Sequence, residues 1–277
     1  MTGKIPAFVF SVVALLLVAT PSRAGDGLLP GAKPEDPLVI EANRLDMKDA
    51  RKLLTYSGNV LVTNGPSTLK SADLTIHLDN ATSGPASTTD RVNRIDANGP
   101  VVINTQKEAY SGNLLQYDRQ KNKIYMNGNV TIQQGDGLTK ADNLEYDKAG
   151  GTALLTGNVV FQKGAAVVKG EKLTYDQKRD KIILTNNVVY VSGETSVTGR
   201  KMDFDKKANT ALFTGDVVYV KKDTVVRGDA MEYNLTTNQG VVRTGAAPAP
   251  NPTGAPVAAT PGNRVKAIFT PGQGKGM

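Results

Sequence analysis

The chain of 277 residues contains no cysteine and no tryptophan, a single histidine (His77), and only 5% aromatic residues. Without cysteine there are no disulfides, so the stability of the fold has to come from packing and strand pairing. The lack of cysteine and the single histidine also remove most routes to a zinc, haem or iron–sulfur site. We therefore expect neither a metal centre nor a bound cofactor.

Sequence motifs of catalysis are also missing. The chain has no Gly-x-Ser-x-Gly, no phosphate-binding loop and no dinucleotide fingerprint. Acidic residues occur in pairs such as Asp203 and Asp205, but these flank an apolar strand position and therefore face solvent together. General-acid catalysis needs a desolvated carboxyl group, which this pattern does not provide. We do not expect an enzyme.

The formal charge of +7 overstates the basic character of the folded part. Two cations, Lys4 and Arg23, lie in the first 24 residues, and three more, Arg264, Lys266 and Lys275, lie in a tail without acids. The body between these segments carries only about +2, and its lysines alternate with acids. No basic stripe is present, so nucleic-acid binding loses its main support.

The N-terminal residues 1–24 are typical of a secretory signal peptide. Lys4 gives a positive start, residues 7–19 are almost wholly apolar, and Ser22-Arg23-Ala24 fits a small-x-small cleavage site. The apolar run is shorter than the roughly 20 residues of a bilayer span. We expect a cleaved signal, with an uncleaved anchor as the alternative, and a short flexible lead-in over residues 25–37.

The central feature of the chain is a repeat of 29 residues. A Gly-Asn/Asp-Val motif recurs at this spacing, at residues 128–130, 157–159 and 215–217, and residues 186–188 (Asn-Asn-Val) take the same place in their unit. A Leu/Met-x-aromatic motif keeps the same spacing, at Tyr117, Tyr146, Tyr175, Phe204 and Tyr233. Two earlier units fit if residues 79–90 are an insert. About seven units then cover residues 38–245, which indicates a stacked, elongated array.

Each repeat is predicted to be a hairpin of two long strands. In residues 140–169, Leu144 and Tyr146 alternate with acids, and Val159 and Phe161 resume an apolar face after Gly157-Asn158. Both strands carry a small residue midway, where one of them changes its apolar parity. Such a change marks a bulge or corner. We expect an all-β domain whose strands all bend at one level, so that two inner faces look at each other.

The inner positions are large and apolar throughout, and two interpretations remain open. Either these side chains fill a closed core, or the faces stay apart and leave an apolar groove along the stack. The residues expected to line this interior are Val62, Ile103, Met126, Ile132, Leu155, Phe161, Leu184, Tyr190, Phe213 and Tyr219.

Polar residues recur after the aromatic position, at Asp118, Asp147, Asp176, Asp205 and Asn234. A calcium roll would need Gly-Gly-x-Gly-x-Asp nonapeptides, which are absent. We expect these side chains to start turns. His77 occupies the corresponding place in its unit and is expected to be a surface or turn residue.

The repeat resembles a known family. Residues 141–147 (Ala-Asp-Asn-Leu-Glu-Tyr-Asp), the Gly157-Asn158-Val159 motif and an early Ile40-Glu41-Ala42-Asn43 resemble the OstA-like (LptA) periplasmic lipopolysaccharide-transport proteins. This resemblance covers residues 37–245. It implies a twisted β-jelly-roll, shaped like a boat or taco and open at both ends, whose apolar interior holds the acyl chains of lipopolysaccharide.

The resemblance also implies partners. Molecules of this family join head to tail and bridge an inner-membrane LptC-like protein and an outer-membrane LptD-like protein across the periplasm. Both edges of the predicted stack lack the prolines that blunt exposed edges. Residues 246–277, rich in Pro, Ala and Gly, are expected to be a disordered tail; one option is that it folds back and caps the last edge. The alternative function is a closed, exported β-repeat protein with a structural or adhesive role and no lipid.

Overall fold

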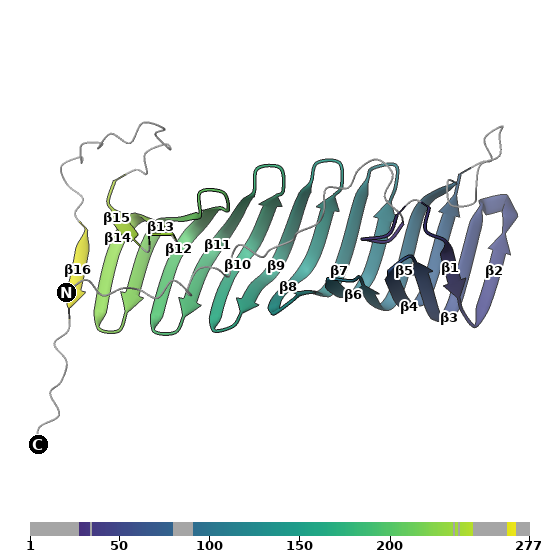
Figure 1. Ribbon diagram of the computed structural model, residues 1–277, viewed down its shortest axis with the longest axis horizontal. Coiled ribbons are helices and arrows are strands. Elements are labelled where there is room, and N and C mark those ends of the chain that lie inside the picture. The colour runs from purple at the N-terminus through teal and green to yellow at the C-terminus, as the bar shows by residue number, and fades with distance from the viewer. Residues whose placement is uncertain are drawn as a thin grey trace, which may run out of the picture.

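A computed structural model describes residues 28–33, 35–79, 91–234, 236–237, 239–245 and 265–269. The predicted signal peptide lies outside these residues, and so does the predicted insert except Asp79. Within them, sixteen strands form one antiparallel sheet whose order follows the chain (Figure 1). No helix in the described residues is long and apolar enough to cross a membrane. The prediction of an elongated all-β fold is confirmed.

Twelve long strands of 11 to 13 residues make up the body of the sheet, and each pairs with the strand before and the strand after it. They are β3 (Leu53–Asn64), β4 (Ser67–Leu78), β5 (Val92–Asn104), β6 (Glu108–Asp118), β7 (Lys123–Gln134), β8 (Gly137–Asp147), β9 (Thr152–Lys163), β10 (Ala166–Asp176), β11 (Lys181–Ser192), β12 (Thr195–Asp205), β13 (Thr210–Lys221) and β14 (Thr224–Asn234). Because every connection joins neighbouring strands, the sheet grows in one direction only.

Short strands finish the sheet at both ends. At the first end, β1 (Leu38–Glu41) and β2 (Arg44–Lys48) both pair with β3, and a 3-10 turn, η3 (Asp49–Arg51), leads from β2 to β3. At the last end, β15 (Gln239–Arg243) and β16 (Lys266–Phe269) both pair with β14. The count of seven sequence units stays a prediction.

The Gly-Asn motif places a bulge at the same level in successive hairpins. Gly157 and Asn158 both have positive φ, at 76° and 47°, and the register of β9 against β10 shifts there. The corresponding pairs at 58–59, 128–129, 186–187 and 215–216 have the same backbone conformation. Glycine and asparagine tolerate this left-handed region better than other residues. The motif therefore encodes the bend that was predicted from the parity change.

Polar side chains bridge the bulge to the neighbouring strand. The Asn158 amide donates to Asp142 at 3.0 Å, and the Asn187 amide donates to Glu171 at 2.6 Å. One unit further on, Arg200 and Asp216 form an ion pair. These pairs are exposed and sixteen residues apart in sequence, so each unit ties its own bend.

The recurring Asp and Asn residues start turns, as predicted. The Asp118 carboxylate accepts the Lys121 backbone N–H at 3.0 Å, and this bond lowers the pKa of Asp118. Asp205 accepts the Ala208 N–H at 2.9 Å, with the same effect on its pKa. The turns also bond to one another: the Lys148 N–H, for example, donates to the carbonyl of Asn122 in the unit before.

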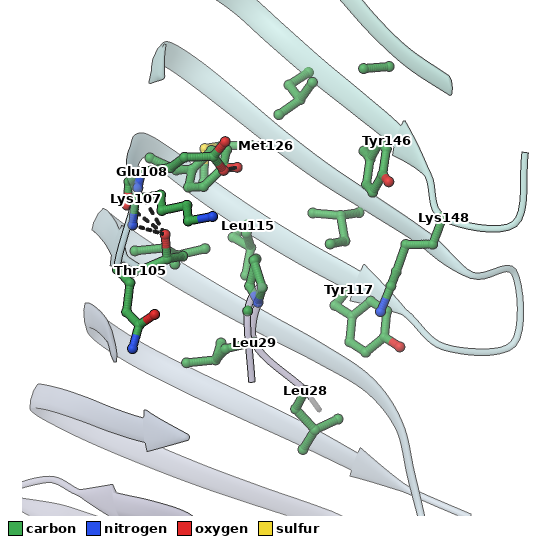
Figure 2. Close-up of a pocket in the computed structure, with 18 of the residues that line it drawn as sticks. Leu28, Leu29, Thr105, Lys107, Glu108, Leu115, Tyr117, Met126, Tyr146 and Lys148 are labelled. Atoms are coloured by element: carbon green, nitrogen blue, oxygen red, sulfur yellow. Dashed lines mark hydrogen bonds between the residues drawn. The ribbon is translucent and has the colours of Figure 1, made fainter. Parts of the chain in front are cut away.

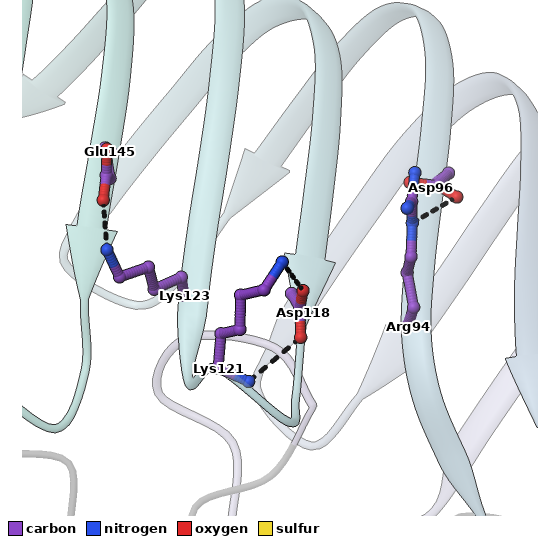
Figure 3. A network of polar contacts seen from close by, with 6 residues as sticks. All are labelled: Arg94, Asp96, Asp118, Lys121, Lys123 and Glu145. Atoms are coloured by element: carbon purple, nitrogen blue, oxygen red, sulfur yellow. Dashed lines mark hydrogen bonds and ion pairs between the residues drawn. The ribbon is translucent and has the colours of Figure 1, made fainter. Parts of the chain in front are cut away.

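Ion pairs line the strands around these turns (Figure 3). Lys123 reaches Glu145 on the next strand at 2.5 Å, and Arg94 contacts Asp96 at 2.8 Å. His77 lies in β4, where its Nε2 is 2.9 Å from Asp96. All these side chains are partly exposed. Such pairs contribute at most about 1 kcal/mol each and do not hold the sheet together.

Two expectations about the ends need correction. The lead-in is not free over its described residues, because Leu29 and Ala32 are buried. The tail is not wholly disordered either, because residues 266–269 form β16. In both cases a short apolar run (Leu28-Leu29 and Val265 to Phe269) is long enough to pair or pack, although its surroundings are rich in proline and glycine.

The left-handed pair at the bend predicts an asymmetric response to substitution. Asn158→Val should lower the free energy of unfolding by about 1–2 kcal/mol, because a β-branched residue is strained at positive φ. Asn158→Gly should cost less, since glycine accepts this backbone and only the exposed hydrogen bond to Asp142 is lost. Urea denaturation monitored by circular dichroism measures both. Equal midpoints for the two variants would contradict this account of the bend.

Candidate functional site

An apolar cavity of about 330 Å³ lies between the two inner faces of the bent sheet, in its N-terminal part. Side chains from β5 to β9 line it, on both sides of the bulges. Ile103 and Tyr110 come from one side of the bend, whereas Leu115, Met126 and Leu144 come from the other. This volume is within the range of small-molecule and lipid sites.

The lead-in forms one wall of this cavity. Leu28 and Leu29 lie against it, as Figure 2 shows, and Pro30 and Gly31 complete the wall. The Leu29 N–H donates to the Asn64 side chain at 3.2 Å. These two leucines, nine and ten residues before β1, therefore cover apolar surface of the cavity that would otherwise be exposed to water.

Polar and charged groups lie at two margins of the cavity. At one margin the Thr105 hydroxyl accepts the backbone N–H groups of Lys107 and Glu108, at 3.2 and 3.0 Å (Figure 2). At the other margin Lys148 Nζ lies 5.3 Å from the ring centroid of Tyr117, which is a cation–π distance. Lys107 and Lys148 therefore place positive charge beside an apolar space.

Among the residues that the structure describes, Glu108 is the one acidic residue that lines the cavity. The Tyr110 hydroxyl donates to one of its oxygens, and the Gln134 amide donates to the other at 2.8 Å. Burial raises the pKa of the Glu108 carboxyl, and the hydrogen bond from Tyr110 opposes that rise. Burial also raises the pKa of the Tyr110 phenol above its ordinary range.

The C-terminal part of the interior is filled. Between β9 and β12, only about 10 Å³ is left among side chains such as Phe161, Leu173 and Met202. Tyr190 and Phe213 have no exposed surface. Here the interpretation of a closed core holds, whereas in the N-terminal part an open space remains.

All ten residues predicted to lie in the interior do so. Ile103 and Met126 line the large cavity, and Phe161 and Leu184 line the small one. Tyr219 is partly buried against the core, and the other five are buried in it: Val62, Ile132, Leu155, Tyr190 and Phe213. Their contact with lipid stays a prediction.

Sequence reasoning missed several residues of the large cavity, namely Leu28, Leu29, Glu108, Tyr110 and Lys148. The leucine pair was a detectable signal, because two large apolar residues are unusual in a flexible segment. Glu108 gave no signal, because its partial burial depends on contacts made only in the folded chain, such as those with Tyr110 and Gln134.

Comparisons with known proteins found a family model and a solved structure that are similar to this chain. The family model described as "LptA/(LptD N-terminal domain) LPS transport protein" matches residues 39–148, 108–210 and 138–239. Among solved structures, the chain is similar to LptH from Pseudomonas aeruginosa, described as the LptA homologous periplasmic component of the conserved lipopolysaccharide transport device. The identity is 17%, the match covers 44% of this chain and 84% of that chain, and the TM-score is 0.37. No curated protein sequence matches.

The half-buried carboxyl of Glu108 predicts a pH-dependent stability. A raised pKa in the folded state means that the contribution of Glu108 to stability is fully present below its ordinary value of 4.5 and is lost as the pH rises through the folded value. The Glu108→Gln variant cannot ionise at this position and does not lose that stability. The melting temperature of the variant minus that of the parent protein should therefore increase between pH 4 and pH 7. The exposed Glu171→Gln serves as the control. A difference that stays constant or shrinks with rising pH would contradict the prediction.

Proposed function

This chain belongs to the family of LptA and LptD N-terminal-domain lipopolysaccharide-transport proteins, and on that premise we propose that it is a periplasmic bridge protein. In this proposal it carries lipopolysaccharide from an inner-membrane to an outer-membrane export complex, with the acyl chains held in the apolar interior. The N-terminal signal, residues 1–24, would bring it to the periplasm and be removed there.

The observation that supports the proposal most directly is the cavity of about 330 Å³ between the two inner faces. A lipid with several acyl chains cannot cross an aqueous compartment uncovered, because each CH₂ group costs about 0.8 kcal/mol when exposed to water. An apolar space walled by strands provides that cover. Transport of this kind needs no catalytic residue, which agrees with the lack of catalytic motifs.

The distribution of charge at the cavity suits an amphiphile with an anionic headgroup. Lys107 and Lys148 lie at opposite margins, while the space between them is apolar. We place the acyl chains against Ile103, Met126 and Leu144, and the headgroup at the two lysines. The ten interior residues are the wider set of lipid-binding candidates, and those of the filled C-terminal part would contact lipid only if the two faces separate.

Head-to-tail partners are part of the proposal. The sheet has two ends, at β1/β2 and at β15/β16, and edge strands present unpaired backbone groups that can continue a sheet. We assign the first end to an LptC-like partner and the last end to an LptD-like partner. This polarity comes from the family resemblance alone.

The filled C-terminal interior favours a second candidate. The residual space of only about 10 Å³ there fits an exported β-repeat protein with a structural or adhesive role and no lipid. The two candidates differ in whether lipid enters the interior, which a crosslinking experiment decides.

We expect a photo-crosslinking residue at Tyr146, which lines the cavity, to capture purified lipopolysaccharide. The same residue at Tyr125 should not, because Tyr125 alternates with the inward Ile124 and Met126 and so points away from the interior. Immunoblots for lipopolysaccharide on the crosslinked protein measure capture.

A third position, Phe213, tests the filled part. Capture at Phe213 as well as at Tyr146 would show that the faces separate around lipid, and capture at Tyr146 alone would confine lipid to the N-terminal cavity. Equal capture at Tyr125 and Tyr146, or none at any position, would refute the proposed lipid site and favour the structural protein.

A further inference from the structure

The last row of the sheet is built from two separate pieces of chain. We call half A the side of the bulges that contains residues 60–64 of β3, and half B the side that contains residues 53–57. β15 pairs with residues 230–234 of β14, which lie in half B. β16 pairs with residues 224–227 of β14, which lie in half A. β15 ends at Arg243 and β16 begins at Lys266, and together the two strands cover both halves of β14 (Figure 1).

The first row is divided in the same way. β1 pairs with residues 61–64 of β3 in half A, and β2 pairs with residues 53–57 in half B. The lengths also correspond: β1 and β16 have four residues each, and β2 and β15 have five each. Both ends of the sheet therefore present two short strands at the same levels.

Strand direction decides whether these ends fit each other. Neighbouring strands alternate from β3 to β14, so β14 runs opposite to β3. β1 runs opposite to β3 and therefore parallel to β14, whereas β16 runs opposite to β14. In a head-to-tail arrangement without β16, β1 of a second copy would lie parallel to β14. With β16 in place, β1 of that copy lies beside β16 and runs antiparallel to it. β2 of that copy likewise meets β15 antiparallel.

We propose that the C-terminal strand β16 completes the last edge as a docking surface for the β1/β2 edge of a second copy. This inference rests on the head-to-tail assembly in the proposed function and adds the element that makes it possible. Without β16, half A would end one strand, or about 4.8 Å, short of half B, and a straight partner edge could pair with only one of them.

The side chains at the two ends support this pairing. Of the seven large hydrophobic residues that are exposed among the described residues, five lie in or directly beside the four short strands: Val39, Leu45, Met47, Val241 and Val265. If the rows of the two copies lie level, Glu41 at the inner end of β1 comes opposite Lys266 at the inner end of β16. In half B, Arg44 comes opposite Arg243, and each of these already has an acidic partner in its own chain, Asp46 and Glu232.

β16 lacks the features of a strand that blocks an edge. Such strands carry prolines or several charges, whereas residues 265–269 contain no proline and one charge, Lys266. The earlier option that the tail caps the edge and limits growth therefore fits the sequence of β16 poorly. β16 also pairs with β14 in the monomer, so the edge to which a partner would bind is already formed there.

Two truncations of the full-length protein test this role. A chain that ends at Phe269 keeps β16, and a chain that ends at Gly245 loses it. We expect the first to associate like the parent protein in sedimentation velocity, and the second to associate at least about tenfold more weakly, since a lost hydrogen bond is worth about 1 kcal/mol and more than one is lost. Equal or stronger association of the chain that ends at Gly245 would overturn the role of β16 and leave the proposed lipid transport intact.

A disulfide between copies tests the register, because the parent protein has no cysteine. In a chain carrying Glu41→Cys and Lys266→Cys, directly opposed residues lie about 4.5–5.5 Å apart between Cα atoms, which a disulfide can bridge. We expect a ladder of linear oligomers on non-reducing gels. Glu41→Cys with Arg243→Cys, which lie in different halves, is the matched control and should give no ladder.

The outcomes separate the two proposals. A ladder only with the first cysteine pair supports the docking of β1 on β16. A ladder only with the control pair, or none with either, overturns it. Capture of lipopolysaccharide at Tyr146 is read independently, so a protein that binds lipid but never associates would refute the docking surface and keep the lipid site.

Discussion

The whole molecule depends on a left-handed pair of residues, Gly-Asn or a variant of it, that interrupts five of the six long hairpins at the same level; in β5 only Gly99 has positive φ. A straight strand of a dozen residues could bury one face over its full length only if a second layer of structure packed against it. Because residues such as Gly157 and Asn158 take positive φ, each strand bends, and its two halves turn their apolar faces toward each other. A single sheet thereby supplies both walls of its own core.

Glycines on the partner strands adapt this core to large side chains. A Cβ at Gly170 would come within 2.7 Å of the Leu184 side chain, and one at Gly112 equally close to Met126. The small residue at the bend therefore makes room for a large neighbour, which explains why the two motifs share one period. Where the facing residues are large enough, between β9 and β12, they fill the interior; around Leu115 and Met126 they leave the cavity.

The body of the fold could be predicted from the sequence because every long strand repeats the same local pattern. Period-2 alternation, the Gly-Asn pair and the Asp or Asn turn all act within about 30 residues, so no distant contact is needed to interpret them. The ends could not be predicted in this way. Leu29 is held in the wall of the cavity by a hydrogen bond to Asn64, which is 35 residues away in sequence. β16 pairs with a strand that ends more than thirty residues earlier. Such contacts are hard to predict in a proline-rich segment. Composition describes the average of the whole segment, whereas each of these contacts depends on a few residues within it.

The same constraint links the interior to the edges. Since all rows bend at one level, the interior of the sheet can continue into a second copy only if the junction keeps that level in both halves. A junction through half B alone would leave half A unpaired and let water reach the apolar faces at every contact between copies. If the protein covers acyl chains along its length, as we propose, an edge completed by β16 is a condition for an unbroken apolar path, so that the proposed lipid transport depends on the edge geometry.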